Sequence, residues 1–479
     1  MKNQEFQHHP KYLSLSLRLT LFAFLFALAF APTLFAQWEP DRRLTFDSAY
    51  SQAYPWNFLA AGPGGVLHVV WDDERDGNRE IYYKRSTDEG NNWSADTRLT
   101  FDTLESWGAS VSVSGIYVHV VWLDGRNGNW DTYYRRSTDE GVTWSPDMRL
   151  TSDPYGAWFP SAAVSGNNVH VVFGEPSGGP IEIYYMRSTD AGNAWSAPTR
   201  LTYDPNISKF PFVAVSNSNV HVFWIDDRDG NDEIYYKRSS DGGTSWSGDT
   251  RFTFTPTPTW TPCVSVLGAN VHAVWGDSVD GNFEVYYRRS TDSGVTWSGT
   301  TRLTYNLSPS IGPSIFASGN NAHVVWMDSL DGNWEIYYKF SSDGGVTWSG
   351  DTRLTNDLNS SWLPAISTSG TDVHVVWTDD RNGNLEIYYK RNQTGNIGVE
   401  EKAEDGQRFE ARLKSEPNPF TSFATVPGHE RERFSLYDIS GRKVGTYKGD
   451  RVGEGLTPGI YFLKPEQVSL KLLRIVKLR

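Results

Sequence analysis

Arginine, glutamate and tyrosine recur at fixed positions in this chain, and together they could bind an acidic ligand or transfer protons. The planar guanidinium of arginine binds a carboxylate through two parallel hydrogen bonds. A glutamate two residues before a tyrosine shares a strand face with it, so the pair could act on one ligand. The arginines, which are ligand-binding candidates, are Arg75, Arg126, Arg228 and Arg381. The glutamates are Glu80, Glu182, Glu233, Glu284, Glu335 and Glu386.

Both sets belong to a repeat of 51 residues, and the repeat limits what they can do. A unique reaction needs unlike groups in one pocket, whereas a residue that recurs in every repeat usually stabilises the repeat itself. We therefore expect structural work from most of these side chains.

The repeat predicts an all-β fold. In the second copy, residues 109–113, 117–122, 131–137 and 148–151 are short β-rich runs separated by turn residues, which is typical of four antiparallel strands. Four strands per copy and a period near 50 predict a seven-bladed β-propeller without insertions. One histidine per copy marks the register: His68, His119, His170, His221, His272, His323 and His374. A ring of single histidines is too wide for a shared metal ion with bonds of ~2 Å, so we expect buried core residues.

The N-terminal segment supplies the piece that the seventh copy lacks. Residues 38–45 are an orphan copy of an outer strand, and we expect them to pair with residues 386–389 and close the ring. Closure removes the open sheet edges that would otherwise aggregate. A six-bladed ring with one stray repeat is the alternative.

Six copies carry a segment of the form S-x-D-x-G-x-x-W, such as RSTDEGVTW at residues 136–144. The aspartate can accept backbone N–H bonds in a tight turn, the glycine can adopt a positive φ, and the tryptophan can fill the gap between strands. These segments resemble the Asp-box, or bacterial neuraminidase repeat, of the sialidase superfamily. The resemblance implies a structural role for the six aspartates: Asp88, Asp139, Asp190, Asp241, Asp292 and Asp343.

The same resemblance raises the question of catalysis. A sialidase-like enzyme uses three arginines for the substrate carboxylate, a tyrosine with a glutamate as nucleophile, and an aspartate as acid or base. The Arg-Ile-Pro motif that normally supplies one of those arginines is absent from this sequence. Whether the protein is an enzyme is therefore open, and we favour binding without catalysis over a sialidase-like glycoside hydrolase.

The loops between successive blades carry the remaining functional signal. Tryptophans around the mouth of the channel could form a stacking platform for sugars or protein chains, or each could simply pack over its neighbouring blade. The third copy departs most from the others, so a specific pocket is expected between blades three and four near Glu175, Trp158 and Lys209. The loop tryptophans at 51-residue spacing are Trp56, Trp107, Trp158, Trp260 and Trp362.

A ring of acidic residues beside the polar turns could bind Ca²⁺, because oxygen-rich turns do so; capping of the turns explains the same residues. No other cofactor is expected. The ring comprises Asp73, Asp124, Glu175, Asp226, Asp277, Asp328 and Asp379.

The two ends of the chain indicate export. Residues 1–36 combine basic residues with an apolar run and are typical of a signal peptide. Residues 416–479 carry PNPF, FSLYDISGRKV, LTPGIYFL and RIVKLR, and they resemble the C-terminal sorting domain of type IX secretion, a small β-sandwich of Bacteroidota and related bacteria. The resemblance implies recognition by that machinery and a place outside the cell or on its surface. Residues 396–415 are expected to be a linker.

Composition narrows the partners further. The net charge of -13 argues against nucleic acid, and the single Cys263 leaves no intramolecular disulfide. We expect a monomeric, secreted or surface-attached propeller that binds glycan or protein through its loops. A structural or adhesive spacer is a further alternative, favoured if the tryptophans are buried.

Overall fold

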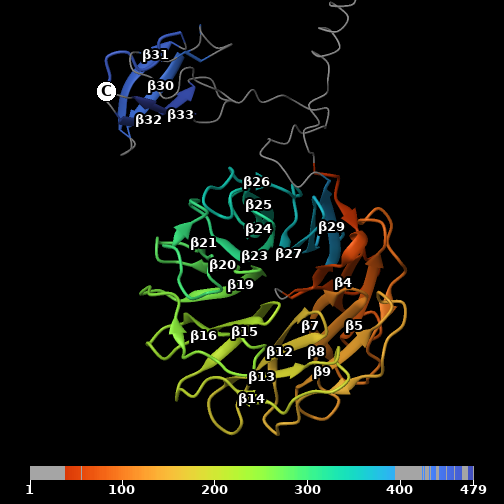
Figure 1. The fold of residues 1–479 in the computed structure, drawn as a ribbon. Coiled ribbons are helices and arrows are strands. Elements are labelled where there is room, and N and C mark those ends of the chain that lie inside the picture. Colours follow the sequence, from red (N-terminus) through yellow and green to blue (C-terminus); the bar gives the residue numbers. More distant parts are fainter. Residues whose placement is uncertain are drawn as a thin grey trace, which may run out of the picture. The chain divides into compact units, whose positions relative to one another are not determined.

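The repeats fold into a ring of twisted β-sheets (Figure 1). The computed structural model describes residues 38–54, 57–393, 423, 425–426, 431, 433–438, 442–448, 450–457, 459–465 and 473–477. The chain divides into two compact units, Met1–Glu401 and Lys402–Arg479. The predicted signal peptide and linker lie outside the described residues. Within the described part of the chain, no helix is long and apolar enough to cross a membrane.

Each repeat contributes one sheet, which we call a blade and number from the N-terminus. Blade one contains β2 (Ser51–Gln52), β3 (Leu59–Ala61), β4 (Leu67–Asp73), β5 (Glu80–Ser86) and β6 (Thr97–Arg98), with the 3-10 turn η1 (Pro63–Gly65). Blade two contains β7 (Ser106–Ser114), β8 (Tyr117–Asp124), β9 (Asp131–Ser137) and β10 (Met148–Arg149). Blade three contains β11 (Trp158–Ser165), β12 (Asn168–Glu175), β13 (Glu182–Ser188) and β14 (Thr199–Arg200). Blade four contains β15 (Ser208–Ser216), β16 (Asn219–Asp226), β17 (Glu233–Ser239) and β18 (Thr250–Arg251).

The remaining blades follow the same order. Blade five contains β19 (Thr259–Leu267), β20 (Asn270–Asp277), β21 (Glu284–Ser290) and β22 (Thr301–Arg302). Blade six contains β23 (Ser310–Ser318), β24 (Asn321–Asp328), β25 (Glu335–Ser341) and β26 (Thr352–Arg353). Blade seven contains β27 (Ser361–Ser369), β28 (Asp372–Asp379), β29 (Glu386–Asn392) and the N-terminal β1 (Arg42–Arg43). This arrangement of repeated antiparallel sheets is a β-propeller.

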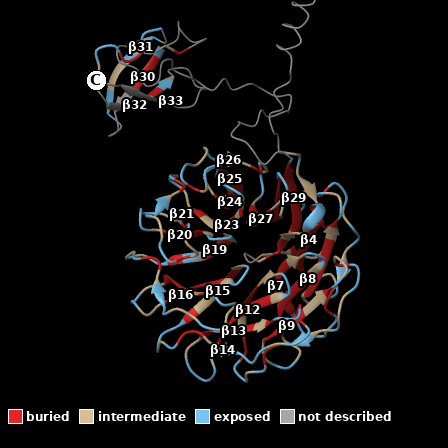
Figure 2. Cartoon of the chain, in the orientation of Figure 1, coloured by how far each residue is buried: buried red, intermediate tan, exposed pale blue. Residues whose placement is uncertain are grey.

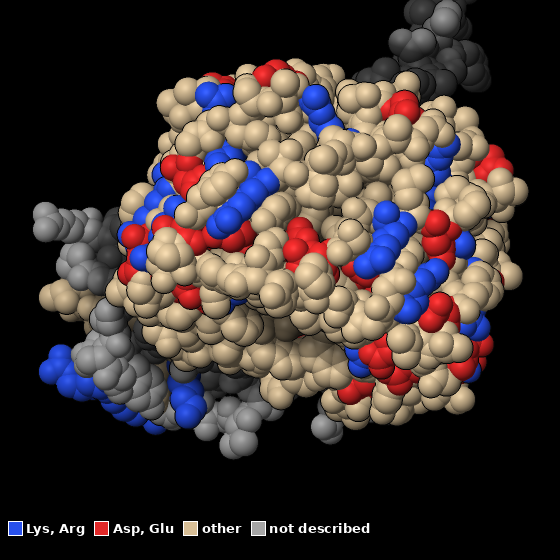
Figure 3. Space-filling view, turned by 90° about the horizontal axis from the view of Figure 1, so that it is seen from below, with Lys and Arg blue, Asp and Glu red and all other residues tan. Residues whose placement is uncertain are grey.

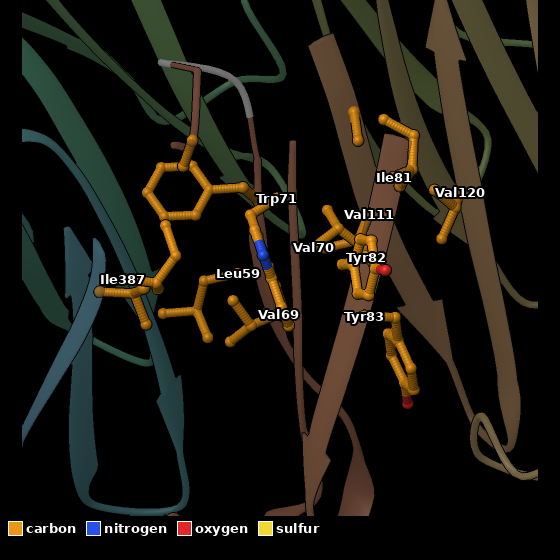
Figure 4. Close-up of a cluster of buried hydrophobic side chains, with 14 of the residues drawn as sticks. Leu59, Val69, Val70, Trp71, Ile81, Tyr82, Tyr83, Val111, Val120 and Ile387 are labelled. Atoms are coloured by element: carbon orange, nitrogen blue, oxygen red, sulfur yellow. The ribbon is translucent and has the colours of Figure 1, made fainter. Parts of the chain in front are cut away.

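The blades stack because their middle strands are apolar on both faces. In blade one, Val69 and Trp71 lie on the side of Ile387 from blade seven, whereas Val70 lies on the side of Val111 from blade two (Figure 4). Side chains of a strand alternate between its faces, so a continuous apolar run buries both. Burial is accordingly concentrated in the strands, and the connecting loops are exposed (Figure 2).

The S-x-D-x-G-x-x-W segments, which we call box turns, join neighbouring blades. In blade two, Asp139 Oδ1 accepts the backbone N–H of Thr143 at 2.8 Å, as predicted for this turn. The tryptophan differs from the prediction: Trp144 packs edge-on against Tyr83 of blade one, with centroids 4.9 Å apart, and so fills a gap between blades. Arg85 of blade one also donates to the Glu140 carbonyl at 2.9 Å.

The seven histidines are buried and hydrogen-bonded, which confirms that prediction. In blade one, Nδ1 of His68 bonds the hydroxyl of Tyr83 at 2.7 Å, and the other histidines bond the equivalent tyrosine. Burial is the main cause that lowers their pKa, to about 3 for His68 and about 4 for His221. They are neutral core residues.

The predicted pairing of the chain's two distant segments is confirmed. Arg42 lies opposite Tyr389 and Arg43 opposite Tyr388 in an antiparallel register. Arg43 also forms an ion pair with the fully buried Glu386. The N-terminal strand therefore serves as the outer strand of blade seven.

Blade one departs from the expected regular spacing. Its inner strand is split, and residues 53–57 lie between the paired stretches where blade two has only Gly108 and Ala109. As a result Gln52, opposite Asp72, takes the ladder position that Trp107 takes opposite Leu123. The expectation of a repeat without insertions was therefore wrong here, because it rested on the second strands alone.

The C-terminal unit contains an antiparallel sheet in the order β31 (Lys443–Lys448), β30 (Arg433–Asp438), β32 (Gly459–Pro465), β33 (Leu473–Lys477). Its buried residues include Phe434, Leu436 and Leu463. The described residues of this unit show one sheet, so the two-layer sandwich stays a prediction.

Candidate functional site

We call the end of the ring at which the inner strands begin the loop face. The described ligand-binding candidates lie on this face. It also carries the turns between the second and third strands of each blade, because neighbouring strands are antiparallel. The box turns lie at the opposite ends of the same strands. Acidic and basic side chains interleave on the side of the ring shown in Figure 3, without a large patch of one sign.

Each inner strand of blades two to seven contains a β-bulge at the loop face. In blade two the residue after Trp107 is Gly108, with φ 71°. Phe159, Phe210 and Leu363 adopt positive φ at the same step, although they carry a Cβ. Such bulges re-aim side chains, and strained backbone concentrates at functional sites. The rings of Phe159 and Phe210 lie 4.1 Å apart, centroid to centroid, and link blades three and four.

The described loop tryptophans are at least partly exposed, so they can meet a ligand. Trp260 is 52% exposed, and Trp107, Trp158 and Trp362 are half-buried. Trp56 lies outside the described residues. In blade one the ladder position that corresponds to Trp107 is held by Gln52.

Blades one and two together form an aromatic cluster, defined as Tyr54, Trp107 and Trp130. The ring of Trp107 lies 5.3 Å from that of Tyr54 and 5.7 Å, edge-on, from that of Trp130. Arg79 Nη1 donates to the Tyr54 hydroxyl at 3.2 Å, and Arg79 Nε donates to Glu74 at 3.1 Å. Flat apolar rings and hydrogen-bonding groups therefore stand side by side.

Asp72 fixes the backbone beneath this cluster. Its carboxylate is buried and accepts the N–H of Gly108, with N to O distances of 3.2 and 3.1 Å. Burial raises the pKa of Asp72 to about 8, opposed by backbone hydrogen bonds. Because Gly108 follows Trp107, this contact positions the indole.

Four residues of this site were not predicted from the sequence: Tyr54, Asp72, Arg79 and Trp130. A signal for Asp72 was present, since the other blades place uncharged residues at its ladder position, such as Leu123 and Ile225. Tyr54 carried no such signal, because it belongs to the insertion.

The four predicted ligand-binding arginines have partners within the protein. Arg75 donates from Nε and Nη2 to the two oxygens of Asp73, both at 2.7 Å, and from Nη1 to Asp96 at 2.7 Å. Its guanidinium also stacks on the ring of Tyr82, 4.5 Å from the centroid. Each of the other three makes the same kind of pair, with Asp124, Asp226 or Asp379. Their hydrogen-bonding capacity therefore serves the blade.

The glutamates of the third strands are also engaged. Glu80 is fully buried and accepts Arg98 Nη2 at 2.8 Å, and the other five glutamates accept the equivalent arginine or threonine. These pairs tie each outer strand to its blade.

The acidic ring proposed for Ca²⁺ faces protein donors in most blades. Asp73 Oδ2 accepts Trp71 Nε1 and the Ser51 hydroxyl, both at 2.8 Å. Among the described residues, no group of three or more His, Cys, Asp or Glu side chains could hold a metal ion.

The expected pocket between blades three and four does not form around its three named residues. Glu175 interacts with Asp153 and Asp131, on the side of blade two. Lys209 forms an ion pair with Asp232 of its own blade, N to O 3.0 Å. Trp158 lies opposite Gly174, whose neighbour Glu175 points to the other face of the strand.

The central channel contains a cavity of about 480 Å³. Inner-strand residues such as Val111, Val213, Val264 and Ile315 line it. The four described loop tryptophans do not, so a ligand that stacks on them would lie at the loop face outside this cavity.

Comparisons with known proteins show the fold. No model of a known protein family matches this sequence, and no curated protein is similar to it. The solved polysaccharide lyase Uly1 aligns with a TM-score of 0.51 and 10% identity, over 74% of this chain and 99% of that chain. The NanB sialidase of Streptococcus pneumoniae aligns with a TM-score of 0.42 and 12% identity, over 74% of this chain and 70% of that chain. The alpha-L-arabinanase of Penicillium chrysogenum aligns with a TM-score of 0.42 and 16% identity, over 57% of this chain and 89% of that chain. At such identities the likeness to Uly1 shows a shared fold alone.

Proposed function

We propose that this protein is an exported, seven-bladed, sialidase-like propeller that binds glycan through its loop face without catalysis. The aromatic cluster carries the proposal: Trp107 and Trp130 meet edge-on, and Tyr54 with its partner Arg79 stands beside them. Sugar rings present C–H faces to aromatic rings and hydroxyls to polar groups, which is the combination found here.

Variation between blades supports the loop face as the binding surface. The core positions repeat around the ring, whereas the loop-face position of Trp130 varies among the blades. The position of Trp107 is also tryptophan in blades three, five and seven, but it is Lys209 in blade four and Ile311 in blade six. Blade four has the ion pair of Lys209 and Asp232, and blade five has Trp260 with Phe283, 5.9 Å apart. Residues that the blade architecture does not require to repeat are free to serve a ligand.

The engagement of the repeated polar residues supports binding without catalysis. A sialidase-like site needs arginines that are available to a substrate carboxylate, and Arg75 and its three equivalents are bidentate to their own aspartates. The partial exposure of the tryptophans favours a binding protein over a passive spacer.

The remaining parts of the proposal concern location. The signal-like residues 1–36 and the motifs of residues 416–479 support export and handling by type IX secretion machinery. A glycan-binding propeller would then act outside the cell, secreted or held at its surface, and we expect it to work as a monomer.

A glycan array probed with the purified protein, combined with a fluorogenic sialoside assay, tests the proposal. We expect selective glycan binding that is lost in Trp107→Ala and no release of fluorophore. Hydrolysis of the sialoside would show that the protein is an enzyme and would contradict binding without catalysis. If no glycan binds and the purified protein instead captures a protein ligand, the proposal that the ligand is a glycan is wrong.

A further inference from the structure

Blade three keeps the acidic and aromatic parts of an arginine site without the arginine. In blade two, the guanidinium of Arg126 pairs with Asp124, lies 3.8 Å from Asp102, and stacks 4.5 Å above the ring of Tyr133. The same three places in blade three hold Glu175, Asp153 and Tyr184, and the place of Arg126 holds Ser177.

Every side-chain donor that serves the equivalent carboxylate in blade two is replaced in blade three. Asp124 accepts Arg126, the indole of Trp122 at 2.9 Å and the hydroxyl of Ser106 at 3.1 Å. Their counterparts Ser177, Phe173 and Ala157 cannot replace these bonds: the last two have no side-chain donor, and the Ser177 hydroxyl bonds Asp153 and Tyr184 instead.

Glu175 is consequently a buried carboxylate without a cationic partner. The residue is 7% exposed. Its carboxyl forms a side-chain hydrogen bond with the carboxyl of Asp153, and no other side-chain donor among the described residues bonds its oxygens. Burial first, and then the neighbouring Asp153, raise its pKa to about 7. A buried carboxylate is costly unless it is paired or protonated.

Loss of the arginine alone does not explain this state. Blades five and six also lack the arginine, but their carboxylates have local donors. Asp277 accepts the hydroxyls of Thr255 and Thr257, each at 2.9 Å. Asp328 accepts Asn306 Nδ2 at 2.6 Å and Ser310 at 2.7 Å. Blade three is thus the exception among the seven.

We propose that blade three binds the guanidinium group of a ligand, such as an arginine side chain of a partner protein, between Glu175, Asp153 and Tyr184. Two carboxylates match the donors of a guanidinium, and the tyrosine ring supplies a face for stacking. Ser177 is exposed and sits where the blade's own arginine would enter, so the place is open to solvent. This site is separate in chemistry from the aromatic cluster.

Blade two provides the matched control. Arg126→Ser removes the resident guanidinium from Asp124, Asp102 and Tyr133, so it should create a second site of the same kind. The reverse change is a graft of the blade-two turn, Gly-Arg-Asn-Gly, onto residues 176–179. A graft is needed because Ser177 and Gly178 both have positive φ, with values of 42° and 81°, whereas in the blade-two turn the positive φ is at Gly128.

The test is titration of the full chain with N-acetyl-arginine amide, followed by NMR, with N-acetyl-citrulline amide as the neutral analogue. We expect one saturable site for the arginine compound and no binding of the citrulline compound. Glu175→Gln should weaken binding at least tenfold, the graft should abolish it, and Arg126→Ser should raise the stoichiometry to two. Free L-arginine as a further arm distinguishes a small metabolite from a peptide-borne side chain, since tighter binding of the amide supports the protein partner.

Two results would overturn the inference. One is binding of the arginine compound that survives both Glu175→Gln and the graft. The other is an Arg126→Ser protein that gains a site while the parent protein has none, because Glu175 and Asp153 would then hold a shared proton in place of a cation. If Arg126→Ser does not fold, Glu175→Gln and the graft decide the question.

Discussion

Gly141 of the box turn in blade two lies directly against the hydroxyl of Tyr83 in blade one, and a Cβ at this glycine would overlap that hydroxyl. Tyr83 in turn bonds His68, 2.7 Å from its Nδ1. The box turn of one blade is thereby packed onto the histidine–tyrosine pair of the preceding blade.

This contact predicts that Gly141→Ala destabilises the ring more than an alanine at a glycine with open space around it. Gly128 is the control, because it has a similar φ of 85° and no atom within 4 Å of an added Cβ. Gly128→Ala should cost about 1 kcal/mol for the left-handed backbone, and Gly141→Ala about 1–3 kcal/mol more for the overlap. Denaturant unfolding measures both, and equal losses would show that the blades are not held by this contact.

The buried histidines predict acid lability. Their folded pKa values, about 3 to 4, lie below the unfolded value of 6.5. The unfolded chain therefore binds more protons as the pH falls from 6.5 towards 4, and the free energy of unfolding falls with it. Each histidine contributes a slope of up to about 1.4 kcal/mol per pH unit.

We expect unfolding to become steep below pH 6, before most carboxylates titrate. His119→Gln should reduce the slope of stability against pH by about one histidine's share, while lowering stability at pH 7 through loss of the Tyr134 bond. A slope that is unchanged in this variant would contradict the prediction. Unfolding free energies measured between pH 4.5 and 7.5 supply the test.

The N-terminal strand that closes the ring should contribute as much to stability as the outer strand of any other blade. Arg43 pairs with Glu386 as Arg98 pairs with Glu80, and both glutamates are fully buried. Arg43→Met should therefore cost about 3–5 kcal/mol, because it leaves a buried charge unpaired, and Arg98→Met should cost a similar amount. A negligible loss for Arg43→Met alone, by calorimetry or denaturant, would mean that the N-terminal strand does not hold the ring closed.

Ligand binding should depend on the aromatic cluster. Trp107→Ala and Trp130→Ala should each weaken glycan binding at least tenfold, about 1.4 kcal/mol, without a large change in Tm. Tyr203→Ala is the control: this tyrosine is 72% exposed and stacks with Arg200 outside the cluster. Titration calorimetry with the glycan selected on the array gives the comparison, and equal loss in all three variants would argue against the cluster.

Binding of a guanidinium to blade three should strengthen as the pH rises through 7. The cation binds the ionised form of Glu175, whose pKa is about 7, so affinity at pH 6 should be roughly tenfold below that at pH 8. The groups facing Glu175 are Asp153, Asp131 and, through its ion pair with Asp131, Arg149. Titration with N-acetyl-arginine amide at both pH values checks this, and equal affinity at pH 6 and pH 8 would contradict it.

The amino-acid sequence by itself determined the blade. The 51-residue spacing of the VHV strands, the box turns and the orphan strand at residues 38–45 were enough to predict the propeller fold, the buried histidines and the pairing of Arg43 with the last repeat. These features are local or repeated. Because every copy has the same hydrophobic pattern, the strands can be recognised from the sequence without knowledge of their tertiary contacts.

The tertiary structure decided which polar side chains are available to a ligand. Arg75 looked like a ligand-binding residue, but the strand end brings Asp73 and Asp96 to its guanidinium. Glu175 looked like one more member of an acidic ring, yet its blade has lost all three donors. Tyr54 gained its place from an insertion that shifted the register. Whether a polar side chain can bind a ligand depends on which protein groups lie within hydrogen-bond distance of it. Those groups come from distant parts of the sequence and meet only in the folded protein.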